Sequence, residues 1–252
     1  ILDLASPAME RRVVYFTRGH GESSPQDLDP REGNSVLRGL MEDRNIKVAT
    51  LDLGTIERMP NDALALVISG PKAIFQDKEV KLLRNFLNQN RGRVLLALDP
   101  VEEIALSDRP ALGLRPLLKE WGIRCHDMLV FDPKRENFDL FSGAYFLRTY
   151  QREASHPVVK NLMNEGFSIL ADRCRPVEIE NSTQSPFVGQ ELIFSSRDSW
   201  ALSSWTERSF PPEKNTLLDL AGPVPVLSVS QPNPKLASQA GLTAAGKLMV
   251  LG

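Results

Sequence analysis

Residues 64–100 read LALVISGPKAIFQDKEVKLLRNFLNQNRGRVLLALDP, and this stretch decides the fold. The apolar runs at 64–68 and 94–98 have the pattern of strands buried on both faces. Between them, residues 79–90 carry apolar side chains at helical spacing, which predicts one amphipathic helix. Strand, helix and strand in this order form a β-α-β unit, whose two strands are parallel and whose crossover is right-handed.

The same signals extend this unit in both directions along the chain. Strands are expected at 12–17, 46–53, 123–130, 145–150, 167–170, 175–179, 191–195, 223–230 and 247–251, and helices at 34–44, at 112–121 and from Pro157. The sequence therefore predicts an α/β fold of the Rossmann-like or flavodoxin-like kind. We expect a mostly parallel sheet with helices on both faces and a C-terminal β-rich elaboration.

We expect one domain, whose chain divides into three parts. Residues 1–131 form the α/β core, 132–222 form an elaboration with later strands packed on that core, and 223–252 form returning strands that complete the sheet. The chain has no apolar run of about 18 to 20 residues, the length that spans a bilayer. Because it starts without Met and ends in a strand-like run, we expect a piece of a longer membrane protein.

The composition is that of an ordinary globular protein and argues against two kinds of site. The chain is 42% hydrophobic and 25% charged, with a formal net charge of −2. It has no long basic run, so it lacks the footprint of a nucleic-acid-binding protein. Its three histidines are scattered, and Cys125 and Cys174 have no metal-ligand spacing, so we expect neither a metal nor a cofactor. The two thiols can form one disulfide or stay free.

Three short polar breaks follow predicted strands and supply the candidate ligand-binding residues. They are Gly19, His20, Gly21 and Glu22, then Ser69, Gly70 and Pro71, then Asp99 and Pro100. Ligands of open parallel sheets bind outside the carboxyl ends of the strands, so neighbouring strands would bring these turns to one carboxyl-end crevice. His20 and Glu22 can supply acid–base or hydrogen-bonding groups, and Asp99 can supply an acceptor or a metal ligand. The same residues can also serve only as turn formers.

An enzyme would need a nucleophile or cofactor motif that the sequence does not show. There is no G-x-S-x-G elbow, P-loop, G-x-G-x-x-G or H-E-x-x-H. Cys125 and His126 are neighbours in a predicted strand, where their side chains would point to opposite faces and form no dyad. One alternative stays open: a hydrolase in which Glu22, His20 and Asp99 converge as acid, base and orienter.

A second alternative is a structural interaction scaffold. Such a protein would show an exposed apolar patch around Trp200, Trp205 and Phe210, and no pocket. The same aromatic residues can instead cover the far end of the sheet.

Eight short motifs, in their order along the chain, carry a resemblance to a known family. They lie at 14–22, 51–53, 59–60, 67–71, 95–100, 156–158, 222–225 and 247–252. This order resembles that of the GldG-like auxiliary proteins of ABC transport systems. That family is similar in fold to intraflagellar-transport and class I glutamine-amidotransferase-like α/β domains.

The resemblance implies a domain on the extracytoplasmic, periplasmic face of the inner membrane. It would be tethered by transmembrane helices outside this chain and would work beside an ABC permease and ATPase. The amidotransferase-like relatives that are enzymes carry a nucleophilic Cys after a central strand, where this chain has Ser69-Gly70 and Asp99-Pro100. We therefore expect a non-catalytic module of an ABC-type transport or gliding-related system, without a cofactor, that binds a ligand or partner protein at the carboxyl-end crevice.

Overall fold

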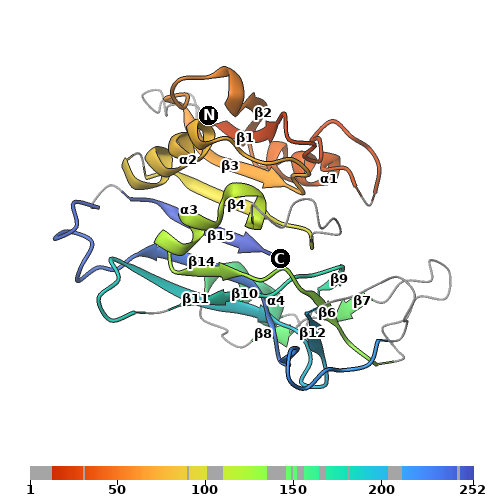
Figure 1. Cartoon of the computed structure of the whole chain (residues 1–252). Coiled ribbons are helices and arrows are strands. Elements are labelled where there is room, and N and C mark those ends of the chain that lie inside the picture. The colour runs from red at the N-terminus through yellow and green to blue at the C-terminus, as the bar shows by residue number, and fades with distance from the viewer. Residues whose placement is uncertain are drawn as a thin grey trace.

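A computed structural model describes residues 13–30, 32–89, 91–100, 110–134, 146–148, 150–151, 156–164, 169–180, 182–203, 212–242 and 245–252. Within these residues the main feature is an eight-stranded sheet. Its strands are β1 (Val13–Arg18), β2 (Lys47–Asp52), β3 (Ala63–Ser69), β4 (Arg93–Ala97), β8 (Tyr150–Gln151), β11 (Phe187–Phe194), β14 (Pro225–Pro232) and β15 (Lys247–Leu251). They lie side by side in the order β2-β1-β3-β4-β15-β14-β11-β8 (Figure 1).

The sheet has a parallel half and an antiparallel half. Strands β2, β1, β3, β4 and β15 are all parallel to their neighbours in that half. Strands β14, β11 and β8 continue the sheet in antiparallel pairing. The predicted α/β fold, mostly parallel with a strand-rich C-terminal part, is therefore confirmed, and the division at 131 and 222 stays a prediction.

Helices cover both faces of the parallel half. On one face, α1 (Ser35–Glu42) sets Leu37 and Met41 against Phe16 and Val67. On the other face, α2 (Asp77–Gln89) and α3 (Arg115–Glu120) bury a larger apolar cluster with the sheet. Burying one Leu or Phe side chain contributes about 1.5–3 kcal/mol, so this face supplies most of the stability of the parallel half.

Short ribbons complete the fold around the antiparallel half. Strand β5 (Ile123–Cys125) pairs with β10 (Val177–Ile179), and two buried serines of β14 hold this ribbon and α3. Ser228 Oγ donates to the carbonyl of Val177, and Ser230 Oγ donates to the carbonyl of Trp121, both at 2.6 Å. A second sheet of β6 (Leu129–Phe131), β12 (Trp200–Leu202) and β13 (Leu220–Ala221) lies beside it. The remaining elements are helix α4 (Pro157–Asn164) and the ribbon of β7 (Phe146–Arg148) with β9 (Leu170–Asp172).

Three predicted elements differ from those of the structure. The strand expected at 145–150 is two strands, β7 and β8, which pair with β9 and β11 respectively. The strand expected at 123–130 is two strands, β5 and β6, because the chain turns at His126, whose carbonyl accepts a bond from Arg175 Nε at 2.9 Å. The helix expected at 112–121 begins only at Arg115. Before it, Ala111 and Leu112 both have a φ of 53°, which a regular right-handed helix excludes.

The structural-scaffold alternative predicted an exposed apolar patch around Trp200, Trp205 and Phe210, and the structure describes one of these residues, Trp200. Trp200 is 8% exposed and packs edge-on against Phe131, with ring centroids 5.1 Å apart. It therefore belongs to a small core and not to an exposed patch. Trp205 and Phe210 lie outside the described residues.

Candidate functional site

The turn after β1 sends His20 into the protein interior. Gly19 and Gly21 have φ values of 112° and 78°, which favour glycine, and they allow the chain to reverse around His20. The His20 carbonyl accepts bonds from the N–H groups of Lys72 and Ala73, at 2.7 and 3.0 Å. The first and second predicted turns are thus joined through their backbones, as expected for neighbouring parallel strands.

The imidazole of His20 is enclosed by two carboxylates and one aromatic ring. Its Nε2 lies 3.1 Å from Glu79 Oε2, and its Nδ1 lies 3.6 Å from Glu22 Oε1. Phe75 stacks on the ring at a centroid distance of 4.1 Å. Only 7% of His20 is exposed, so neither ring nitrogen faces open solvent as a catalytic base would.

Glu79 is the residue of this cluster that the sequence reasoning missed. It is the third residue of α2, and its Oε2 also accepts the N–H of Gln76, just before the helix, at 2.7 Å. This is half of a capping box, in which an acidic residue at the third helical position reaches back to the helix start. The spacing Gln76-x-x-Glu79 at the predicted helix start was the signal that could have identified it.

Asp99 lies on a different side of the crevice, beside Gly70. Gly70 has a φ of 60°, and a Cβ built on it would lie 3.1 Å from Asp99 Oδ2 and 3.7 Å from Ser23 Oγ. Gly70 N–H donates to the carbonyl of Ala97 at 3.1 Å, and Ser23 N–H donates to the carbonyl of Ser69 at 2.8 Å. The carboxyl ends of β1, β3 and β4 therefore meet at Gly70, where the Asp99 carboxylate approaches so closely that a Cβ would need it to shift.

A buried arginine holds the backbone of Asp99 in place. Arg175, which is 1% exposed, donates from Nη1 to the carbonyl of Asp99 at 3.3 Å and from Nε to the carbonyl of His126 at 2.9 Å. Its Nη2 also contacts the carboxylate of Asp127. Three segments of the chain are thus fixed by one guanidinium, whose planar fork suits several oxygen acceptors.

The structure brings the predicted residues together in two groups. His20 and Glu22 meet, but the second carboxylate beside His20 is that of Glu79, and Asp99 lies at Gly70. Pro71 and Pro100 are buried in the turns that end in these groups. Among the described residues, no three His, Cys, Asp or Glu side chains are grouped as a metal ion would require.

Comparison with known proteins identifies the family but no detailed function. A family described as "ABC-type uncharacterized transport system" matches residues 11–231. No match was found among proteins of curated function. None of the helices in the described part of the chain combines the length and hydropathy needed to cross a bilayer.

Among solved structures, the chain is similar to the mmIFT52 N-terminal domain. The two are 15% identical, with a TM-score of 0.60, over 95% of this chain and 85% of that domain. A ThuA-like protein from Bacteroides uniformis is 11% identical, with a TM-score of 0.48, over 98% of this chain and 84% of that one. The GH42 β-galactosidase Gan42B is 10% identical, with a TM-score of 0.45, over 96% of this chain and 27% of that one. At these identities the first likeness concerns the fold alone. The family match spans most of the sequence, and the chain belongs to the family of ABC-type uncharacterized transport system proteins.

Proposed function

We propose that this chain is a non-catalytic auxiliary module of an ABC-type transport system, which binds a ligand or partner protein at the carboxyl-end crevice. Its place would be the periplasmic face of the inner membrane, beside the permease and ATPase. Membership of the family supports a role as an auxiliary transport component. The binding role rests on the geometry of Gly70 and Asp99.

The close approach of the Asp99 carboxylate to Gly70 carries the proposal. Gly70 has no side chain, and any Cβ there would lie 3.1 Å from the Asp99 carboxylate. Asp99 is exposed, while Arg175 fixes its backbone carbonyl. An exposed carboxylate at the carboxyl ends of parallel strands, on a backbone that Arg175 holds, suits a hydrogen-bond donor, such as an amine, a guanidinium or a sugar hydroxyl.

The geometry of His20 supports a role without catalysis. A hydrolase would need His20 to take a proton from a nucleophile or from water within hydrogen-bond reach. Both ring nitrogens of His20 instead face buried carboxylates, those of Glu22 and Glu79. This cluster therefore serves to hold the turn against α2.

The proposal can be tested by thermal-shift screening against sugars, nucleotides, peptides, lipid head groups and divalent metals. A ligand at 100 times its dissociation constant stabilises the folded state by about 2.7 kcal/mol. This shift should be lost in Asp99→Asn, which keeps the shape of the side chain. It should be retained in Glu57→Gln, which removes an exposed carboxylate elsewhere.

Each of the other outcomes has a defined meaning. If no compound shifts the melting temperature, a tagged wild-type chain should retain permease or ATPase subunits from solubilised membranes, and Asp99→Asn should not. A ligand shift that is undiminished in Asp99→Asn would contradict the crevice as the site. Turnover of a small ester, amide or glycoside that is abolished by His20→Ala would contradict the non-catalytic role.

A further inference from the structure

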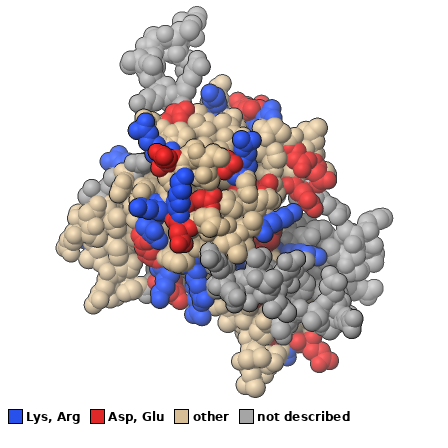
Figure 2. All heavy atoms as spheres, turned by 45° about the horizontal axis from the view of Figure 1, so that its top comes forward, with Lys and Arg blue, Asp and Glu red and all other residues tan. Residues whose placement is uncertain are grey.

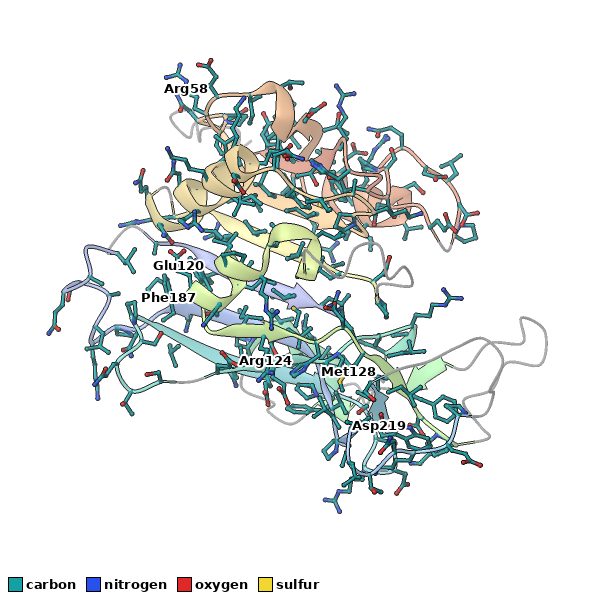
Figure 3. All side chains as sticks on the ribbon, viewed as in Figure 1. Arg58, Glu120, Arg124, Met128, Phe187 and Asp219 are labelled. Carbon is teal, nitrogen blue, oxygen red and sulfur yellow. The ribbon has the colours of Figure 1, made fainter. Side chains whose placement is uncertain are left out.

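A concave site lies between α3 and β5, and none of its lining residues belongs to the predicted carboxyl-end site. It is a pocket of about 270 Å³. Apolar side chains from both elements line it, including Leu118 and Ile123. Its charged lining residues are Arg115 and Lys119 of α3, Arg124 of β5 and Glu180, which follows β10. Figure 3 labels Arg124 on the strand that runs beneath α3.

The charges around this pocket are unbalanced. Three of the four charged lining residues are basic and one is acidic, which leaves a net charge of about +2 on the lining. Glu180 Oε1 lies 3.5 Å from Arg124 Nη1, so the single carboxylate is already engaged. Arg115 and Lys119 make no ion pair with any described residue that the structure shows. This excess contrasts with the chain as a whole, whose net charge is −2, and with the intermixed charges on the face in Figure 2.

Helix stability accounts for Lys119, which lies in the last turn of α3 where a cation is favoured, but it does not account for Arg115. They are four residues apart, so they lie on the same side of the helix, where like charges repel. Arg115 is also the first residue of α3, the end at which the helix dipole disfavours a cation. By contrast, the next residue after Lys119, Glu120, is matched by Arg84 at 2.8 Å. The repulsion between Arg115 and Lys119 costs stability when the pocket is empty. An anion bound in the pocket would offset this repulsion, which explains why the two cations are close together.

We propose that this pocket binds the phosphate group of a small phosphorylated molecule. A phosphate monoester carries a charge of about −1.5 to −2 at neutral pH, which matches the net charge of the lining. The guanidinium groups of Arg115 and Arg124 offer the planar donor pairs that phosphate oxygens accept. Leu118 and Ile123, which are 1% and 2% exposed, line the pocket with a small apolar surface that the group carrying the phosphate would contact. The volume is below the range of about 300–1,000 Å³ that is typical of drug-sized ligands, so it suits one phosphorylated headgroup.

The test uses isothermal titration with inorganic phosphate and phenyl phosphate at constant ionic strength, with phenol as the uncharged control. We expect phenyl phosphate to bind more tightly than inorganic phosphate, and phenol not to bind. The double variant Arg115→Gln/Lys119→Gln should weaken phenyl phosphate binding at least tenfold. The control Lys78→Gln/Lys81→Gln removes the same charge from exposed positions of α2 and should leave the affinity unchanged.

The melting temperature of the double variant Arg115→Gln/Lys119→Gln, measured without any anion, provides a second test. It should rise if the two residues are present to bind an anion, and it should fall if they are present to stabilise the fold. The dipole interactions of Arg115 at the first turn and Lys119 at the last turn have opposite signs and offset each other, so the loss of the repulsion should make the double variant melt about 1 °C higher than the wild type. A lower melting temperature would show that the two residues stabilise the fold. The proposal is overturned if neither phosphate compound binds, or if both double variants weaken binding equally. Equal affinity for inorganic phosphate and phenyl phosphate would overturn the contribution of the apolar surface.

Discussion

His20 and Glu79 are 59 positions apart in the chain, yet His20 Nε2 and Glu79 Oε2 lie 3.1 Å apart in the interior. The contact joins the turn after β1 to the first turn of α2. Since Glu79 Oε2 also accepts the N–H of Gln76, one carboxylate oxygen both caps the helix and holds the turn. The position of the first turn of the crevice therefore depends on a residue outside the predicted site.

Replacing Glu79 with Ala should destabilise the protein strongly. The change removes two hydrogen bonds of a carboxylate and leaves His20 Nε2 buried without its partner. Each buried polar group left without its partner costs about 1–3 kcal/mol, and two groups lose theirs, so we expect a loss near 3 kcal/mol in urea denaturation. The exposed Glu57→Ala should change stability by no more than about 0.5 kcal/mol. A loss below about 1 kcal/mol for Glu79→Ala would mean that the cluster does not hold the turn.

Substitution of Gly70 with Ala should cost more than the same change at Gly241. Both glycines have positive φ, 60° and 71°, so both changes carry the backbone cost of about 1–2 kcal/mol. Only at Gly70 does the new Cβ meet another group, the Asp99 carboxylate, whereas Gly241 has open space around it. The extra cost at Gly70 should shrink when Asp99 is also changed to Ala. A double-mutant cycle measured by urea denaturation will show this, and equal costs at the two glycines would contradict the close approach.

Arg175→Lys should lower stability by about 2–3 kcal/mol, although the charge is kept. Lys cannot reproduce the planar fork with which Arg175 reaches the carbonyls of Asp99 and His126. We expect faster amide hydrogen exchange in the segments around these two residues, measured by mass spectrometry. Arg124→Lys, at an exposed position, should have little effect on either measurement. Unchanged exchange near Asp99 in Arg175→Lys would exclude the arginine as the group that fixes the crevice.

The thiol of Cys125 should react slowly with alkylating reagents in the folded protein. Burial disfavours the thiolate and raises the pKa of Cys125 from 9.0 to about 12. Because only the thiolate reacts, the rate at pH 8 should be about 10³-fold lower than in the unfolded chain. The rate should rise about tenfold per pH unit up to pH 10. Iodoacetamide labelling of a Cys174→Ala variant, with and without guanidinium chloride, tests this. A plateau near pH 9 would contradict the raised pKa.

The two cysteines also illustrate an ambiguity that the sequence left open. Neither cysteine forms a disulfide in the structure. The backbone of Cys125 pairs with that of Val177 in the β5–β10 ribbon, and the backbone of Cys174 forms a bridge with that of Val130, so the two cysteines pair with different segments. Spacing along the chain carries no information on such pairings.

The fold was predictable where its signals were local. Strands β3 and β4 and helix α2 were recovered within two residues at each end, because buried strands and an amphipathic helix differ in the period of their apolar residues. The break between β5 and β6 was not predictable in this way. At this break the His126 carbonyl accepts a hydrogen bond from Arg175, which lies 49 residues further along the chain, and no local pattern indicates such a partner.

The sequence predicted which turns of the candidate site lie close together, but it did not predict which side chains contact His20. The rule that turns gather at the carboxyl ends of parallel strands correctly brought Gly70 and Asp99 together. It could not show that His20 points inward. That orientation depends on Phe75, in the loop before α2, and on Glu79, in the first turn of α2. Whether the crevice binds a ligand remains a prediction for the experiments above.

The central place of β15 has a consequence for how the chain folds during synthesis. This strand lies between β4 and β14, and among the described residues it is the strand whose pairing joins β4 of the parallel half to β14 of the antiparallel half. Until the ribosome has released residues 247–251, each half has an open strand edge, at β4 and at β14, which could pair with another chain. Stalled or truncated translation products that lack this strand should therefore aggregate readily and depend on chaperones.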